Sequence, residues 1–235
     1  MRYIILLMLV MVHFINDGSS ETTVFADSKL IISTSQEANV FLYANSIDRK
    51  YGMYRGFDMK IDGETRYFPY WVNVTNPSYA PRILYKDLNQ DNRKDLIIVL
   101  TKGYGTEVLD NEVHVLNKTQ TSKGEIYEEV LVDNPVAIIF KNVKTKLTQH
   151  EAVVSIGDTK TVMNIENLHI PQDHLFDALA FGSIVKFDVA DGHLVASVGG
   201  QITPAMFIGT IEITYEYKEK MYQAKKIEFK TNSRH

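Results

Sequence analysis

The clearest indication of the fold class is the segment Ile211-Glu212-Ile213-Thr214-Tyr215-Glu216-Tyr217, followed after a short polar turn by Tyr222-Gln223-Ala224-Lys225-Lys226-Ile227-Glu228-Phe229. Apolar and polar side chains alternate in both segments. A period of two is typical of strands with one buried face and one solvated face. We therefore predict an antiparallel hairpin at this end of the chain.

Strand patterns of this kind continue over the rest of the chain from residue 27 onward, where short runs rich in Val, Ile, Tyr and Phe are separated by Gly, Asn and Asp. Asp62-Gly63 and Asp191-Gly192 each join two such runs, and an Asp-Gly pair suits the positive φ angles of a type I′ hairpin turn. We predict strands over residues 29–34, 39–47, 54–61, 65–74, 83–85, 96–101, 112–117, 125–132, 136–140, 152–156, 161–165, 183–189, 193–198, 207–217 and 222–230. The sequence thus predicts a mainly β protein with antiparallel sheets, arranged as a sandwich or as a diverged partial propeller.

One segment has the features of a helix. Pro171 stands where a helix begins, Asp173 lies in the first turn and Gly182 is placed as a stop. We expect one short helix near residues 171–181.

No Pro- or Ser-rich linker divides the chain. If the chain has a domain boundary, it lies at Asp133-Asn134-Pro135 or in the polar segment 141–149. We expect the segment 141–149 to be a solvated loop. We predict one β half over residues 27–133 and a second β half over residues 134–235, packed on the first.

The N-terminal segment is typical of a secretory signal peptide. Arg2 precedes an apolar run from Tyr3 to Ile15, which the polar Asn16 and Asp17 stop well short of the roughly 20 residues a spanning helix needs. We predict cleavage after Ala26, with an uncleaved anchor as the alternative. Either way the remaining chain is expected outside the cytoplasm, secreted or associated with a bacterial-type cell envelope, with no transmembrane segment after cleavage.

Composition excludes several classes of protein. With 25 Lys+Arg against 29 Asp+Glu, the formal net charge is −4, so a nucleic-acid partner is not expected. The chain has no cysteine, which removes disulfides, thiolate zinc sites and cysteine nucleophiles. We expect a protein or glycan partner outside the cytoplasm, whose identity the sequence leaves open.

The spacing of oxygen-bearing side chains in residues 87–95 is typical of a metal-binding loop. Asp87, Asn89, Asp91 and Asp95 occupy loop positions 1, 3, 5 and 9, directly before an apolar strand. Ca²⁺ takes six to eight oxygen ligands, and these side chains with the Arg93 carbonyl at position 7 and water provide them. Mg²⁺ fits less well, because it prefers a small octahedral shell rich in water.

Two further positions of this loop matter. Asn92 occupies position 6, which requires a left-handed backbone that Asn tolerates well. Ile98 occupies position 12, which excludes an ordinary EF-hand because that motif has a bidentate Glu there.

The stretch Asp87 to Leu96, D-x-N-x-D-x-x-x-D-L, resembles the calcium loop of the FG-GAP and VCBS repeat families, with similarity over residues 81–116. The resemblance implies a structural calcium ion in a secreted β protein. The loop occurs once, position 6 is not Gly, and no Phe-Gly/Gly-Ala-Pro pair frames it. Because a propeller repeats such units several times, the single copy favours a non-propeller β domain or an incomplete relative.

A second candidate site is the aromatic segment that contains Tyr67, Tyr70 and Trp71. Exposed Tyr and Trp side chains stack on sugar rings or on a protein partner, whereas alternate aromatics in a β domain usually fill the core. We keep these three residues as a possible binding surface.

Two functions of different class follow. The first is a non-enzymatic extracytoplasmic binding module with a structural Ca²⁺ site. The alternative is a hydrolase or lyase acting on carbohydrate or another envelope polymer, which would need two carboxyls about 5 to 10 Å apart in an open cleft near Tyr70 and Trp71. No catalytic motif is present, so we favour the first.

Overall fold

The computed structural model describes residues 30–122 and 124–232, and the predicted signal segment 1–26 lies outside this part of the chain. The described residues form fifteen strands, one α-helix and three short 3-10 turns. In chain order these are β1 (Leu30–Ser35), β2 (Val40–Asp48), β3 (Met53–Ile61), β4 (Glu64–Val74), η1 (Pro77–Tyr79), β5 (Arg82–Lys86), β6 (Asp95–Gly105), β7 (Val108–Thr121), β8 (Gly124–Val132), α1 (Pro135–Asn142), β9 (Val143–Leu147), β10 (Glu151–Ile156), β11 (Thr159–Asn164), η2 (Glu166–Leu168), η3 (Gln172–His174), β12 (Ala180–Ala190), β13 (His193–Thr203), β14 (Met206–Lys218) and β15 (Met221–Thr231). The predicted mainly β fold is confirmed.

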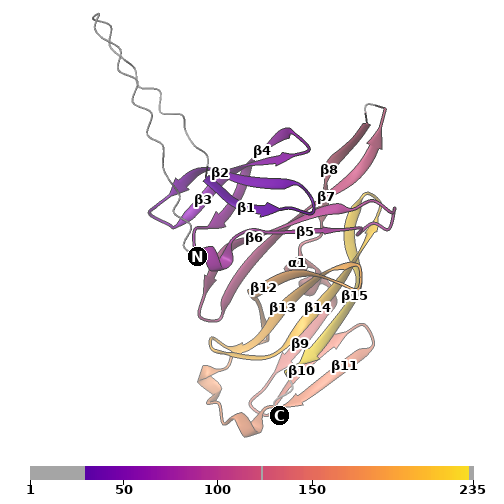
Figure 1. The fold of residues 1–235 in the computed structure, drawn as a ribbon. Coiled ribbons are helices and arrows are strands. Elements are labelled where there is room, and N and C mark those ends of the chain that lie inside the picture. Colours follow the sequence, from indigo (N-terminus) through magenta and orange to yellow (C-terminus); the bar gives the residue numbers. More distant parts are fainter. Residues whose placement is uncertain (1–29, 123, 233–235) are drawn as a thin grey trace, which may run out of the picture.

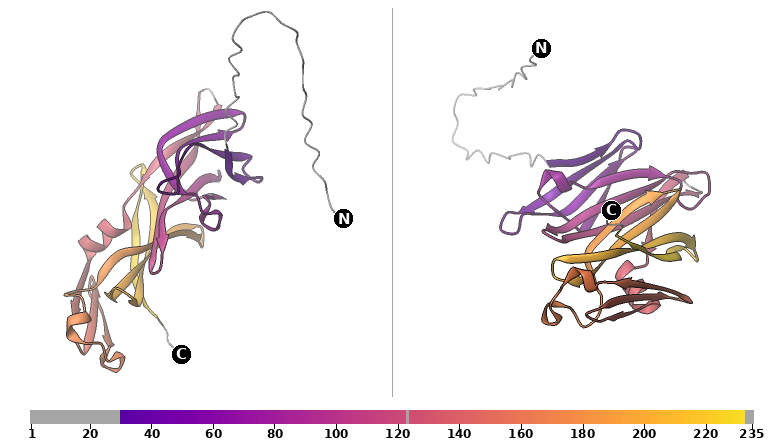
Figure 2. Two further views of the ribbon diagram at one scale, coloured as in Figure 1. Left: turned by 90° about the vertical axis from the view of Figure 1, so that its left-hand side faces the viewer. Right: turned by 90° about the horizontal axis from the view of Figure 1, so that it is seen from below.

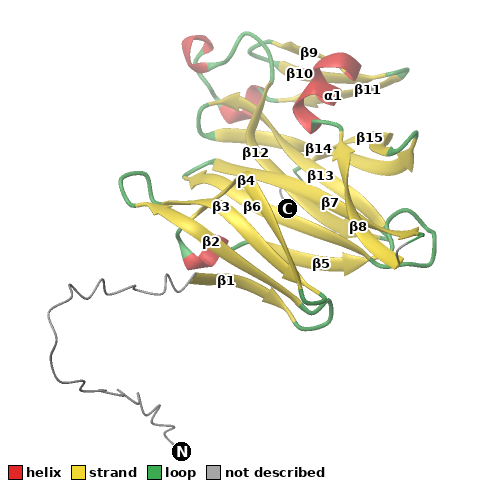
Figure 3. Cartoon of the chain, turned by 90° about the horizontal axis from the view of Figure 1, so that it is seen from above, coloured by secondary structure: helices red, strands yellow, loops and turns green. Residues whose placement is uncertain are grey.

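The strands make three sheets that follow one another along an elongated molecule (Figures 1 and 2). A four-stranded meander, β1-β2-β3-β4, lies at one end. An eight-stranded sheet of order β12-β13-β14-β15-β8-β7-β6-β5 forms the middle, and a three-stranded sheet, β11-β10-β9, lies at the other end. Figure 3 shows the meander lying across β5 to β8 as one layer of a sandwich.

The eight-stranded sheet closes on itself because two strands, β8 and β12, pair with different parts of the same edge of β7. β6 pairs along one edge of β7. On the other edge, β8 pairs with residues 115–121 in the antiparallel sense, and β12 pairs with Leu109 and Asp110 in the parallel sense. A short parallel pairing of β15 with Leu131 and Val132 of β8 completes a ring of β7, β8, β15, β14, β13 and β12.

β6 lies between two hydrophobic cores. Successive side chains of a strand point to opposite faces. Accordingly Leu96, Ile98 and Leu100 pack in the core under the meander, while Ile97 and Val99 pack in the core shared with the ring and the three-stranded sheet. The sandwich and the ring are therefore joined through one strand that is buried on both sides.

The predicted hairpins are confirmed. Asp62 and Gly63 have φ of 48° and 87°, and Asp191 and Gly192 have φ of 50° and 74°, as a type I′ turn requires. The segments 211–217 and 222–229 pair in the antiparallel sense as β14 and β15.

The position of the helix differs from the prediction. The α-helix, α1, occupies residues predicted as the strand 136–140, because Asn134 caps it by accepting the Ala137 N–H at 3.0 Å and Pro135 fills its first position. The helix expected near residues 171–181 is wrong: only η3 forms there. Beyond η3, the Phe176 N–H donates to the carbonyl of Ile202, so this segment is held to β13.

The segment 141–149 also differs from expectation. It is not a solvated loop, because residues 143–147 form β9 and pair with β10. The boundary predicted at residue 133 falls between β8 and α1, and strands from both sides of it share the eight-stranded sheet. No helix among the described residues is long and apolar enough to cross a membrane.

Candidate functional site

The loop of residues 87–94 closes the hairpin between β5 and β6, and its last partner, Asp95, is the first residue of β6. Within the loop, acidic and amide side chains turn inward to the loop's own backbone. Asp87 accepts the N–H groups of Asp91 and Asn92 at 3.2 and 3.0 Å, and Asn89 accepts the same Asp91 N–H at 3.1 Å. Asp91 in turn accepts the Arg93 N–H at 2.9 Å.

The backbone supports this inward arrangement. Asn92 has a φ of 66°, so the left-handed conformation expected at position 6 is confirmed, and Gln90 has a φ of 62°. The left-handed Gln90 and Asn92 make the loop tight. As a result, a side-chain oxygen of Asp87 and one of Asn89 both lie within 3.2 Å of the Asp91 backbone nitrogen.

Asp95 is different, because its side chain is fully buried. Its carboxylate accepts three backbone N–H groups, from Leu88 at 2.9 Å, from Asn89 at 3.4 Å and from Lys118 of β7 at 3.1 Å. Burial raises the pKa of this carboxyl, and the backbone donors oppose that shift. Asp95 thus fastens the loop both to its own start and to the neighbouring strand.

The chemistry of the donor set fits a hard cation. All the candidate side chains offer oxygen, three of them are carboxylates, and a carboxylate oxygen that accepts one N–H keeps a lone pair for an ion. In the described part of the chain, no three His, Cys, Asp or Glu side chains are grouped as a metal site requires. Arg93 Nη1 also lies 3.6 Å from Asp91 Oδ2. A calcium ion shared by these three carboxylates therefore requires them to lie closer together than they do here.

The aromatic segment does not form the exposed pair considered from the sequence. Trp71 is only 4% exposed; it stacks on Phe68 at 3.9 Å and on His114 at 4.4 Å between ring centroids. Tyr67 and Tyr70, at 61% and 90% exposed, lie on the surface. Trp71 is therefore removed from the candidate binding surface, because its side chain fills the core beneath β4.

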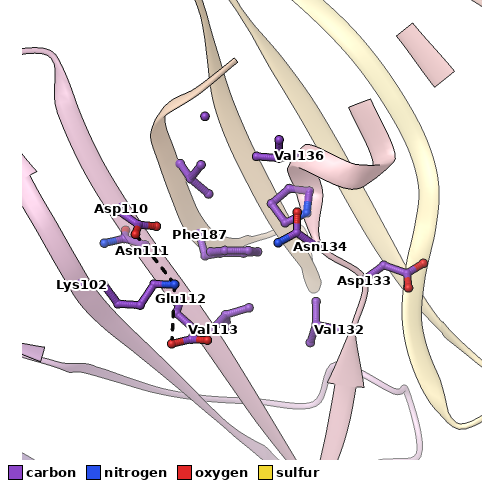
Figure 4. A pocket seen from close by; sticks show the side chains of 13 residues that line it. Lys102, Asp110, Asn111, Glu112, Val113, Val132, Asp133, Asn134, Val136 and Phe187 are labelled. Carbon is purple, nitrogen blue, oxygen red and sulfur yellow. Dashed lines mark ion pairs between the residues drawn. The ribbon is translucent and has the colours of Figure 1, made fainter. Parts of the chain in front are cut away.

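A pocket that no sequence motif predicts lies where β8 leaves β7 (Figure 4). This pocket of about 260 Å³ is lined by β7, β12 and the start of α1. Lys102 Nζ lies 3.8 Å from Asp110 Oδ2 and 3.9 Å from Glu112 Oε2. Three acidic residues line the pocket, Asp110, Glu112 and Asp133, and the first two share the Lys102 ammonium. This ion-pair cluster gives the hydrolase alternative no specific support.

A larger groove of about 770 Å³ runs between the β3–β4 hairpin and β8. We call it the acidic groove, because its lining includes five carboxylates and one arginine: Asp62, Glu64, Glu125, Glu128, Glu129 and Arg66. Spacing could not reveal it, since its residues come from two hairpins about 60 residues apart that only the tertiary fold brings together.

Comparisons with protein-family models, with curated proteins and with solved structures found no match for this chain. The resemblance of residues 81–116 to FG-GAP and VCBS repeats stays a prediction from the sequence.

Proposed function

We propose that this protein is a non-enzymatic, extracytoplasmic interaction domain in which Ca²⁺ orders the loop of residues 87–95. The ion would be held by the side chains of Asp87, Asn89, Asp91 and Asp95 and by the carbonyl of Arg93. The single observation that carries the proposal is the inward arrangement of Asp87, Asn89 and Asp91 around a loop in which Asn92 is left-handed.

The position of the loop supports a structural role for the ion. Asp95 accepts the Lys118 N–H, and Arg93 Nε lies 3.9 Å from Glu125 Oε1, so the loop contacts both strands of the β7–β8 hairpin. An ion that fixes the loop would also steady this hairpin. The proposed role is thus to hold a surface in shape, without taking part in chemistry.

The proposed location outside the cytoplasm agrees with this ion. Extracellular calcium modules bind with dissociation constants of about 0.1 to 1 mM, which suits an environment rich in calcium. The apolar run 3–15 behind a basic residue and the absence of cysteine support export. They fit a domain that relies on an ion in place of disulfides.

Thermal unfolding tests the proposal, with Ca²⁺, with Mg²⁺ and with a chelator. For a site of roughly 0.1 mM affinity, about 1 mM Ca²⁺ should add on the order of 1.4 kcal/mol to the free energy of unfolding. We expect Asp91→Ala to abolish this gain. Asp158→Ala, which changes an exposed aspartate in the β10–β11 turn, should keep it. Equal stability in all three conditions would contradict the calcium proposal.

A further inference from the structure

Over most of its length, β8 has an edge that no other strand of residues 30–122 and 124–232 covers. One edge pairs with β7 along residues 124–130. The other edge pairs with β15 only at Leu131 and Val132, so the described structure leaves residues 124–130 without a partner strand on that side. Figure 1 shows the β7–β8 hairpin projecting beside the β3–β4 hairpin, so this open edge faces the acidic groove.

The direction of the backbone groups on this edge follows from two hydrogen bonds. In the β7–β8 ladder, Lys118 lies opposite Tyr127. The Lys118 N–H donates to Asp95 and therefore points away from β8. Lys118 and Tyr127 thus form a pair without mutual hydrogen bonds. Arg66 donates to the Tyr127 carbonyl from the groove side, as this requires. Because the pattern alternates, the N–H and C=O groups of Glu125, Tyr127 and Glu129 all face the groove.

The charges around this edge favour a basic partner. Glu125 is paired with Lys118, and Glu129 lies 2.8 Å from His114. Asp62, Glu64 and Glu128 make no ion pair with another described residue. The groove therefore has an open strand edge and uncompensated negative charge.

We propose that the acidic groove binds an extended, Lys/Arg-rich segment of a partner protein, which adds to the edge of β8 as a further strand. This rests on the proposed function as an interaction domain and names the class of partner. Backbone hydrogen bonds to Glu125, Tyr127 and Glu129 provide affinity, and side chains of opposite charge select the peptide.

Two features of the chain support this choice of partner. Arg66 of this chain already donates to the Tyr127 carbonyl from the groove side, so this edge accepts a cationic donor, and an added strand takes over that acceptor as Arg66 swings aside. Two copies of β8 would bring acidic residues together, so edge-to-edge pairing of this protein with itself is opposed by repulsion. The negative charge thus disfavours pairing with a second copy of this chain and favours pairing with a basic strand.

The test uses the purified protein and a fluorescent peptide of about nine residues in which Lys and Val alternate. Two peptides serve as controls: one with Glu in place of Lys, and one with alternate backbone nitrogens methylated, which keeps the charge but removes the edge hydrogen bonds. We expect the Lys peptide to bind at about 0.1 M salt, with affinity at least about tenfold above both controls, and to weaken at about 0.5 M salt.

Variants at one position separate backbone from charge. Glu125→Pro removes an N–H that faces the groove, and Pro is tolerated on an open edge. Glu125→Gln removes the same charge and keeps the N–H. We expect a loss of about two- to fivefold for the Gln variant and a larger loss for the Pro variant. Equal losses would overturn strand addition.

Hydrogen exchange locates the bound peptide within β8. The amides of Glu125, Tyr127 and Glu129 should exchange fast in the free protein and slow on binding, whereas those of Ile126 and Glu128, already paired with β7, should change little. Equal binding of the methylated peptide, protection elsewhere, or no binding of the Lys peptide would each overturn the proposal. So would a dimer of the protein that Glu125→Pro dissociates, because it would assign the edge to a second copy.

Running the binding assay with Ca²⁺ and with chelator keeps the two proposals apart. Peptide binding in both conditions, with no calcium effect on unfolding, supports the groove and contradicts the calcium site. A calcium-dependent gain in stability without peptide binding supports the site and overturns the groove.

Discussion

The carboxylate of Asp95 and the backbone amide of Lys118 are joined by a 3.1 Å hydrogen bond between the first residue of β6 and the far part of β7. Lys118 also pairs with Glu125 of β8 at 2.7 Å. One buried side chain therefore connects the candidate calcium loop to the strand pair that borders the acidic groove. The same hydrogen bond shows that the Lys118 N–H points away from β8, and with the β7–β8 register it identifies the β8 amides that face outward.

Asp95→Ala is expected to destabilise the protein by about 3 kcal/mol or more, with and without calcium. The substitution leaves three backbone N–H groups without their acceptor, and each buried unpaired donor costs about 1 to 3 kcal/mol. Urea unfolding in chelator measures this. Asp91→Ala is the matched change in the same loop and should cost much less in chelator. Similar losses for the two variants would contradict a bracing role for Asp95.

Trp71→Ala and Tyr70→Ala should differ widely although the residues are adjacent. Trp71 is 4% exposed and stacked between Phe68 and His114, so its truncation should cost about 3 to 5 kcal/mol. Tyr70 is 90% exposed, so its loss should change stability by less than about 0.5 kcal/mol. Comparable losses in denaturant unfolding would mean that Tyr70 makes contacts the structure does not show.

Gly209→Ala should destabilise the β14–β15 pair. A Cβ at this position would lie 2.4 Å from the Phe229 ring and 2.6 Å from the Lys230 carbonyl oxygen. Such overpacking costs about 1 to 3 kcal/mol or more. Gly103→Ala is the control, because its Cβ would meet only Asp110 at an ordinary 3.8 Å. A lower thermal midpoint for Gly209→Ala than for Gly103→Ala checks this, and equal midpoints would contradict it.

The Glu129–His114 contact should make stability depend on pH. The hydrogen bond with His114 holds the pKa of Glu129 below its ordinary value of 4.5, although burial opposes this shift. A lowered folded pKa adds stability that is present above the unfolded pKa and is lost as the pH falls through the folded pKa. The contribution should be below about 1 kcal/mol, because the side chain is 40% exposed.

Melting curves between about pH 6 and pH 3 check this expectation. The wild type should exceed Glu129→Gln in stability near pH 6, and the gap should close in acid. Glu128→Gln, which removes a neighbouring carboxylate without an ion partner among the described residues, should show no such convergence. A gap for Glu129→Gln that stays constant over the range would contradict the role assigned to the pair.

Features that depend on neighbouring residues could be predicted from the sequence. Alternation in 211–217 and 222–229 predicted β14 and β15, because a strand's two faces are set by its own period. Asp62-Gly63 and Asp191-Gly192 predicted their turns, and position 6 predicted the left-handed Asn92, because φ is a local property.

The pairing of strand edges and the burial of strand faces depend on how distant parts of the chain pack together. The strand predicted at 136–140 is a different kind of error, because the signal for α1 is local: Asn134 is an N-cap and Pro135 stands at the first helical position. Trp71 is buried because the meander lies across β7. The open edge of β8 exists because β15 pairs with only its last two residues. The burial of Trp71 and the open edge of β8 depend on contacts between residues distant in the chain, about which local spacing carries no information.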